Sequence, residues 1–135
     1  MELYKAFQIS AAGMRAQGTR LRIAAENVAN ADSLPTQPGQ DPYRRKLLTF
    51  KNVMDREVGV EMVKVNKVVP DRSDFGMKYE PSHPAANDQG YVQTPNVETL
   101  VEMMDMREAQ RSYEANLNVI QSSRSMLLKT LDILQ

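Results

Sequence analysis

The final third of the chain constrains the fold most, because residues 97–134 contain neither glycine nor proline. Apolar residues recur there at alternating steps of four and three, which is the spacing of one face of a long helix. The pattern predicts a C-terminal helix that begins just after Pro95, with Asn96 as its N-terminal cap. One charged residue, Arg124, interrupts the apolar line. The full line is Tyr113, Leu117, Ile120, Arg124, Leu127, Leu131 and Leu134.

The N-terminal segment has the same spacing but is a weaker helix former. Gly13 and Gly18 each destabilise a helix by about 1 kcal/mol relative to alanine. Two positions of the line, Ser10 and Gln17, are polar. We therefore expect this segment to need a partner, and to end near Asn30, because the prolines that follow cannot continue a helix. Its apolar or small residues are Leu3, Phe7, Met14, Leu21, Ala24 and Val28.

Between these helices the sequence predicts three or four short strands. Four segments are rich in β-branched and aromatic residues and have the length of strands. In the second, Val60 and Met62 share one face while Val63 and Val65 share the other, so either a bulge or burial on both faces is expected. Residues 80–90 have the composition of a loop. The strand segments are 43–50, 58–69, 75–80 and 90–94.

These elements predict a mainly α protein with a small β-rich middle, whose long terminal helices pair as an antiparallel, coiled-coil-like hairpin. Such a pair covers only one face of each helix. Exposed apolar surface commonly marks a partner surface, and copies related by a rotation and a rise assemble helically into a tube or filament. The predicted parts are the terminal helices, 1–30 and 96–135, which would take part in such an assembly, and the middle domain 31–95. The surplus apolar residues are Ile9, Ala12, Ala16, Ile23, Val101, Met104 and Ala115.

Composition argues against several classes of function. Seventeen basic and seventeen acidic residues cancel, so the positive excess of a nucleic-acid-binding protein is missing. The chain has no cysteine, which excludes disulfides and thiolate metal sites. The N-terminal segment lacks the features of a cleaved secretory signal, and no apolar run reaches the length of a membrane span. We expect no nucleic-acid partner and no membrane span.

The residues available for catalysis also argue against an enzyme. His83 is the single histidine and lies between two prolines, so no multi-histidine metal centre is expected. Four carboxylates recur at helical spacing in the C-terminal helix, and a solvated helix face explains them better than an acid–base pair. No phosphate-binding loop or hydrolase motif occurs. We predict no catalytic residue, cofactor, metal or small-molecule substrate. The carboxylates are Glu98, Glu102, Asp105 and Glu108.

Some methionines and asparagines leave alternatives open. The cluster Met103, Met104 and Met106 suits either an adaptable binding surface or the filling of gaps in a core. A cap or turn explains Asn30. Asn116 lies in the middle of a predicted helix, where a cap cannot be the reason, so a hydrogen bond between helices and plain solvent exposure are the two explanations.

The motifs at both ends resemble those of bacterial flagellar basal-body rod proteins. ENVANADS closes the first helix, GYVQTPNVE leads into the second, and SYEANLN lies within it. The resemblance covers essentially the whole chain, although a serine ends the first motif where threonine is common. The short middle region points to the proximal-rod members of the family.

The resemblance implies a structural function in the rod that crosses the periplasm and transmits torque from the membrane ring to the hook. It implies export through the flagellar type III apparatus without a cleaved signal peptide. The implied partners are other copies of the chain, other rod proteins, the export apparatus and the membrane-ring base. A helical adaptor or export-associated binding protein of a secretion system is the alternative. The predicted assembly residues are Leu3, Phe7, Met14, Leu21, Ala24, Asn27, Val28, Asn30, Tyr113, Asn116, Leu117, Ile120, Leu127, Leu131 and Leu134.

Overall fold

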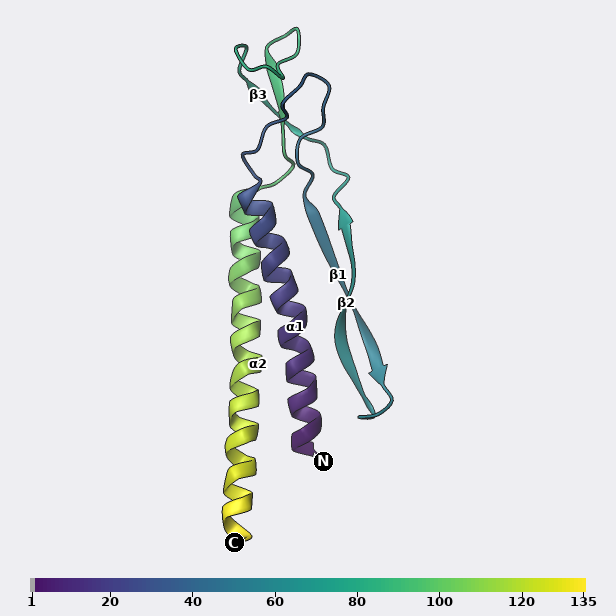
Figure 1. The fold of residues 1–135 in the computed structure, drawn as a ribbon, viewed down its shortest axis with the longest axis vertical. Coiled ribbons are helices and arrows are strands. Elements are labelled where there is room, and N and C mark those ends of the chain that lie inside the picture. The colour runs from purple at the N-terminus through teal and green to yellow at the C-terminus, as the bar shows by residue number, and fades with distance from the viewer. Residues whose placement is uncertain (1) are drawn as a thin grey trace. The chain divides into compact units, whose positions relative to one another are not determined.

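The computed structural model describes residues 2–135. Two long helices lie at the two ends of the chain, and two small two-stranded sheets, β1–β2 and β3–β4, come between them in sequence (Figure 1). This confirms a mainly α protein with a small β-rich middle. The elements are α1 (Glu2–Ala29), β1 (Lys46–Asp55), β2 (Val60–Pro70), β3 (Gly76–Tyr79), β4 (Tyr91–Thr94) and α2 (Thr99–Ile133).

The helix ends follow the sequence signals at α1 but not at α2. Helix α1 ends at Ala29, one residue before the predicted Asn30. Helix α2 begins at Thr99, and the prediction that Asn96 caps it is wrong. The Asn96 side chain instead accepts a hydrogen bond from the Arg45 backbone N–H at 2.8 Å and donates to the Asp71 carbonyl at 3.1 Å. The amide is therefore already used by segments far away in the sequence.

Strands β1 and β2 form a hairpin whose strands run in opposite directions (Figure 1). The turn between them is closed by Asp55, whose carboxylate accepts hydrogen bonds from the backbone of Glu57 and Val58 at 2.9 and 3.2 Å. Gly59 has a φ of 75°, a conformation that glycine adopts without strain. In β2, Met62 is buried and Val63 half-buried. The alternation of burial therefore changes phase at Met62, as predicted.

Strands β3 and β4 pair antiparallel, with Gly76 opposite Thr94 and Tyr79 opposite Tyr91. The two tyrosine rings pack edge to face with their centroids 5.3 Å apart. Aromatic pairs in this geometry stabilise a sheet beyond the area that they bury. Four strands are thus present, which is the upper number that the sequence predicted.

The chain divides into two compact units, and both contain part of each helix. The contacts described below all lie within one unit or the other. The first unit comprises the chain up to Leu21, Thr49–Lys67 and Arg107–Gln135, and the second comprises Arg22–Leu48 and Val68–Met106.

One face of α1 that the sequence predicted to be surplus apolar surface is buried. Ala12 and Ala16 are each 2% exposed, and Ile23 is 4% exposed, so that prediction is wrong for these three. In the first unit, a cavity of about 260 Å³ is lined by residues of α1 and by Val63 and Val65 of β2. The hairpin, which the sequence pattern could not place, therefore covers this face of α1 in the first unit. The predicted residues that remain exposed are Ile9, Val101, Met104 and Ala115.

Helix α2 buries small and polar residues rather than its large apolar line. Its buried positions, Glu102, Ala109 and Ser123, are separated by multiples of seven residues, half-buried Asn116 shares their phase, and Ala109 is fully buried. In contrast, Leu127 and Leu131 are 50% and 48% exposed. Small side chains let two helices approach more closely than leucines do, which explains the difference. We call these positions the buried stripe: Glu102, Ala109, Asn116 and Ser123.

In the first unit the buried stripe meets α1 at Gly13. A Cβ atom on Gly13 would lie 2.8 Å from Asn116 Nδ2, whereas a Cβ on Gly18 would meet nothing within 4 Å. The Asn116 amide donates to the Ser112 carbonyl at 2.9 Å. A side chain at position 13 would therefore displace an amide that is already hydrogen-bonded.

This difference predicts opposite outcomes for two matched substitutions in α1. Gly18→Ala should raise the free energy of unfolding by about 0.5–1 kcal/mol, the helix propensity gain of alanine. Gly13→Ala should lose that gain, because moving Asn116 costs about 1 kcal/mol of hydrogen bonding. Urea denaturation of both variants measures the difference, and adding Asn116→Ala should restore the gain at position 13. Equal stabilisation by both alanines would contradict the contact.

Candidate functional site

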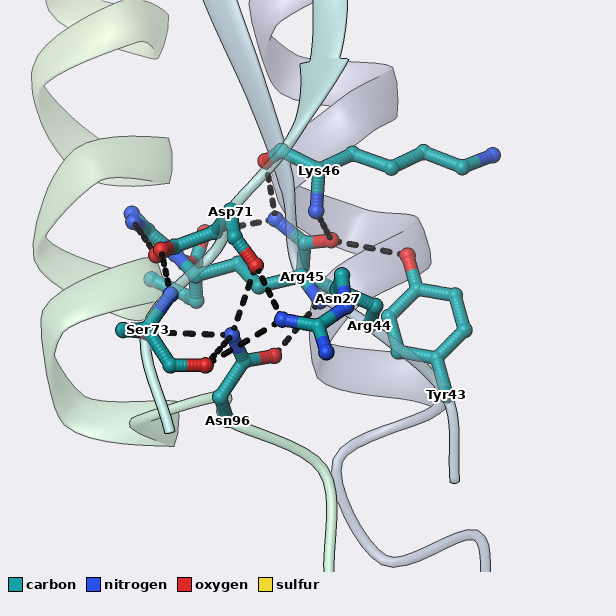
Figure 2. Close-up of polar contacts among 9 residues, drawn as sticks. Asn27, Tyr43, Arg44, Arg45, Lys46, Asp71, Ser73 and Asn96 are labelled. Atoms are coloured by element: carbon teal, nitrogen blue, oxygen red, sulfur yellow. Dashed lines mark hydrogen bonds and ion pairs between the residues drawn. The ribbon is translucent and has the colours of Figure 1, made fainter. Parts of the chain in front are cut away.

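A cluster of hydrogen-bonded polar side chains, which we call the polar junction, lies in the second unit (Figure 2). It brings together residues from the end of α1, the segment just before β1, the segment after β2, the segment before α2 and the first turn of α2. Segments that are far apart in sequence therefore meet through polar groups. The polar junction consists of Asn27, Tyr43, Arg45, Asp71, Asn96 and Glu102.

Glu102 is the buried charge of the polar junction. It is 1% exposed, so the prediction of a solvated helix face is wrong for this carboxylate, although Glu98 and Glu108 are exposed and Asp105 is half-buried. Its carboxylate accepts hydrogen bonds from Asn27 Nδ2 at 3.3 Å and from Arg45 Nε. Removing a carboxylate from water costs several kcal/mol unless it is paired and hydrogen-bonded. Asn27 and Arg45 supply that compensation.

Arg45 links Glu102 to a second carboxylate, Asp71. Its Nη1 atom lies 3.2 Å from Asp71 Oδ2. Burial lowers the pKa of Arg45, but its hydrogen bonds and charge attraction to Glu102 and Asp71 outweigh burial and raise the pKa above its ordinary value. The backbone N–H of Ser73, which donates to Asp71 Oδ1 at 2.9 Å, is the main cause that lowers the pKa of Asp71, and Arg45 adds to it. Arg45 and Asp71 are therefore both charged at neutral pH.

Asn27 uses its full hydrogen-bonding capacity inside the chain (Figure 2). Its Nδ2 donates to the Lys46 carbonyl at 3.0 Å and to Glu102, and its Oδ1 accepts from the Lys46 N–H at 3.0 Å and from the Tyr43 hydroxyl at 2.8 Å. A carboxamide offers two donors and two acceptor positions. Asn27 is also only 1% exposed. It therefore holds the start of β1 against α1 within the second unit.

Two neighbouring groups respond to this environment. Burial raises the pKa of the Tyr43 hydroxyl above its ordinary value. The hydrogen bond from Lys46 Nζ to Glu26 at 3.0 Å is the largest cause that lowers the pKa of Glu26. Neither residue supplies a free proton donor or acceptor near neutral pH, so the chemistry of this region is structural.

The single histidine, outside the polar junction, supports its own loop. His83 Nδ1 accepts a hydrogen bond from the Ala85 N–H at 3.0 Å, which supports the loop it lies in. Across residues 2–135, no three metal-binding side chains converge. Neither α1 nor α2, over the same described residues, is long and apolar enough to cross a membrane.

The structure brings several predicted assembly residues together in the first unit. Leu3, Phe7, Ile120 and Leu127 line a largely apolar groove of about 350 Å³. Most of the predicted set keeps some exposure, and only Ala24 and Asn27 are buried. The half-buried members are Leu3, Met14, Leu21, Val28, Asn30, Tyr113, Asn116, Leu117 and Ile120, and the exposed members are Phe7, Leu127, Leu131 and Leu134.

The open alternatives for the amides and methionines are partly decided. Asn116 donates to Ser112 in its own helix, so the predicted hydrogen bond between helices is not made by this residue but by Asn27. Asn30 donates to the Glu26 carbonyl at 2.8 Å, which fits the end of a helix. Met103 and Met104 are exposed, which favours a surface over a core for both.

Sequence reasoning missed Arg45 and Asp71 entirely and assigned Glu102 to the wrong environment. One signal was present for Glu102, because it shares the seven-residue phase of Ala109, Asn116 and Ser123. That phase was overlooked because its residues are small or polar, whereas amphipathicity is usually sought among large apolar residues.

Long terminal helices with an exposed apolar groove and a fully paired polar cluster define a structural subunit that assembles with partners. The comparisons with known proteins agree. Residues 88–133 match the family described as flagellar basal body rod FlgEFG protein C-terminal. The chain is 51% identical to the flagellar basal-body rod protein FlgC of Agrobacterium fabrum, an alignment that covers 98% of this chain and 96% of that one.

Further relatives have the same name. FlgC of Escherichia coli O6:H1 is 40% identical over 98% of both chains. FlgC of Bacillus subtilis is 34% identical over 98% of this chain and 99% of the relative. The chain therefore belongs to the FlgC family of flagellar basal-body rod proteins. This confirms the resemblance seen in the terminal motifs, and with it a structural protein rather than an enzyme.

The paired state of Asn27 predicts a large effect for one isosteric change. Asn27→Asp removes both donors and adds a negative charge beside Glu102, which should lower the free energy of unfolding by about 3 kcal/mol or more. Asn118→Asp is the matched control, because Asn118 is exposed on α2. Urea denaturation measures the free energy of unfolding of both variants. If the two variants unfold at the same denaturant concentration, the burial and pairing of Asn27 do not stabilise the chain.

The lowered pKa of Asp71 predicts a pH dependence of defined sign. A carboxyl group whose folded pKa is depressed binds its proton more readily in the unfolded chain. Its contribution is complete above its ordinary pKa of 3.8 and is lost as the pH falls below that value. Urea unfolding between pH 6 and pH 3 should therefore show a shallower acid loss of stability in Asp71→Asn than in the native chain. Parallel curves would contradict this assignment.

Proposed function

We propose that this chain is a structural subunit of the proximal rod of the bacterial flagellar basal body. It polymerises into the periplasmic drive shaft that transmits torque from the membrane ring to the hook. Relatives named flagellar basal-body rod proteins, aligned over 98% of the chain, support this proposal.

The observation that carries the proposal is the exposure of large apolar residues on the predicted assembly lines. Leu131 of α2 is 48% exposed, and Leu134, directly after the helix, is 78% exposed. In the first unit, Phe7 and Leu127 line an open apolar groove. Apolar surface of this extent marks a contact with other chains. Neighbouring subunits in the rod would cover it.

Contacts between the helices support an antiparallel, coiled-coil-like hairpin. In the first unit Gly13 meets Asn116, and Arg20 Nη2 lies 3.5 Å from Glu108 Oε2. Seven residues forward along α1 therefore correspond to eight residues backward along α2. The hairpins of neighbouring subunits pack side by side, so that residues 1–30 and 96–135 build the tube and residues 31–95 contact neighbours outside it.

The proposal extends to partners and location. The chain contacts other copies of itself and other rod proteins, and during assembly it meets the flagellar type III export apparatus and the membrane-ring base. It occupies the part of the rod that crosses the periplasm and is exported without a cleaved signal peptide. A motility assay in cells that produce this chain as their only such rod subunit would test its place in the flagellum.

A helical adaptor of a secretion system is the alternative. An adaptor forms a small closed complex, whereas a rod subunit polymerises or co-polymerises with other rod proteins. Light scattering and electron microscopy of the purified chain with rod proteins distinguish the two. Closed complexes of fixed size without filaments or rods would favour the adaptor.

A charge in the exposed apolar line should block assembly without unfolding the subunit. Leu131 is 48% exposed, so Leu131→Asp should change the free energy of unfolding by about 0.5 kcal/mol or less. Basal bodies isolated from the producing cells should lack rods, and motility should be lost. Gln121→Asp is the control on an exposed position of the same helix and should leave motility intact. Normal swimming of the Leu131→Asp strain would remove this residue from the interface.

A further inference from the structure

The buried stripe of α2 leaves the register of helix pairing ambiguous. Equivalent positions on heptad helices meet again when one helix slides by seven residues. Gly13, which now meets Asn116, would then face Ala109 or Ser123. Both are small enough to fit beside a glycine. The close contact at Gly13 therefore does not by itself distinguish the native register from its two neighbours.

Glu102 breaks this equivalence in the second unit. It lies at the same phase of the buried stripe but bears a charge, and its carboxylate accepts the Asn27 amide at 3.3 Å. Sliding α2 by seven residues would place Ala109 opposite Asn27. Glu102 would then lose that hydrogen bond, and a buried charge without its partners is strongly destabilising.

Asn27 is itself fixed in place and cannot follow a sliding helix. The nitrogen of its side-chain amide donates to the Lys46 carbonyl and the oxygen accepts from the Lys46 N–H, both at 3.0 Å. Arg45, the residue before Lys46, donates to Glu102 as well. The Asn27 amide, held by the start of β1, and the Arg45 guanidinium therefore meet at the same carboxylate of α2.

We propose that the contact of Glu102 with Asn27 and Arg45 selects the register in which α1 and α2 pair. The inference rests on the antiparallel pairing proposed above. Its consequence for assembly is that every subunit presents the same surface, because the register decides which residues of α1 lie beside Ile120 and Leu127 in the apolar groove. A buried charge in this position contributes specificity more than stability.

Paired cysteines measure the register directly, since the chain has no cysteine of its own. A Cβ on Gly13 would lie 3.1 Å from Asn116 Cγ, so Gly13→Cys with Asn116→Cys is within disulfide reach. Gly13→Cys with Ala109→Cys, and with Ser123→Cys, report the two shifted registers. In the purified full chain under mild oxidation, the native pair should close about tenfold faster or more than either shifted pair.

Changes at Glu102 should alter that preference. Glu102→Leu should reduce the rate advantage of the native cysteine pair to about threefold or less, because an apolar side chain at that position fits every register. Glu102→Gln still accepts from Asn27 and should keep it, as should Glu114→Leu, the same replacement at an exposed position. Moving the carboxylate by one heptad, Glu102→Ala with Ala109→Glu, should make the Gly13→Cys and Ser123→Cys pair the fastest.

The outcomes separate the inference from the proposals on which it rests. If the native chain shows no preferred pair, the antiparallel hairpin itself is wrong. If the native pair dominates but is unchanged by Glu102→Leu and by moving the carboxylate, other contacts set the register and this inference fails. Loss of helix by circular dichroism in Glu102→Leu would also overturn it, since Glu102 would then be required for stability rather than for register.

Discussion

The burial of the Glu102 carboxylate is the interaction on which the rest of this structure depends. A charge that is 1% exposed is tolerated only because Asn27 and Arg45 reach it, and those residues come from the end of α1 and from the segment just before β1. One buried charge therefore requires three chain segments to meet at one place. Arg45 continues the chain of contacts to Asp71 after β2, so polar pairing links four segments of the second unit.

The buried and the exposed positions of the helices are occupied by different kinds of residue. Small and polar side chains such as Ala109 are buried within the chain, whereas Leu131 and Leu134 stay exposed. A subunit built in this way is folded by contacts that need close approach, and it leaves large apolar side chains exposed, where the proposed assembly would cover them. This division suits a rod subunit, because burying the leucines within one chain would leave little apolar surface for assembly.

Much of the fold was predictable, because helix periodicity and strand composition are local properties. In residues 2–135 the two helices and four strands overlap the predicted segments, although β1 extends from Lys46 to Asp55 where 43–50 was predicted, and Asn30 and the prolines after it mark the end of α1. Local signals failed where a side chain had a distant partner. Asn96 is a residue type that commonly caps helices, but its side chain is hydrogen-bonded to Arg45 and Asp71. Glu102 has the spacing of a solvated helix face but is buried. No local pattern reveals that Arg45 lies beside Glu102.

The sequence by itself determined which elements form and to which family the chain belongs, since both follow from residues that are near one another along the chain. Only the tertiary structure decided which face of each helix is buried. That choice depends on long-range contacts, namely the hairpin that covers Ala12 and Ala16 in the first unit and the pairing of Asn27 with Glu102 in the second. Heptad spacing allows more than one buried face and more than one pairing register. A buried charge with fixed partners allows far fewer of these faces and registers.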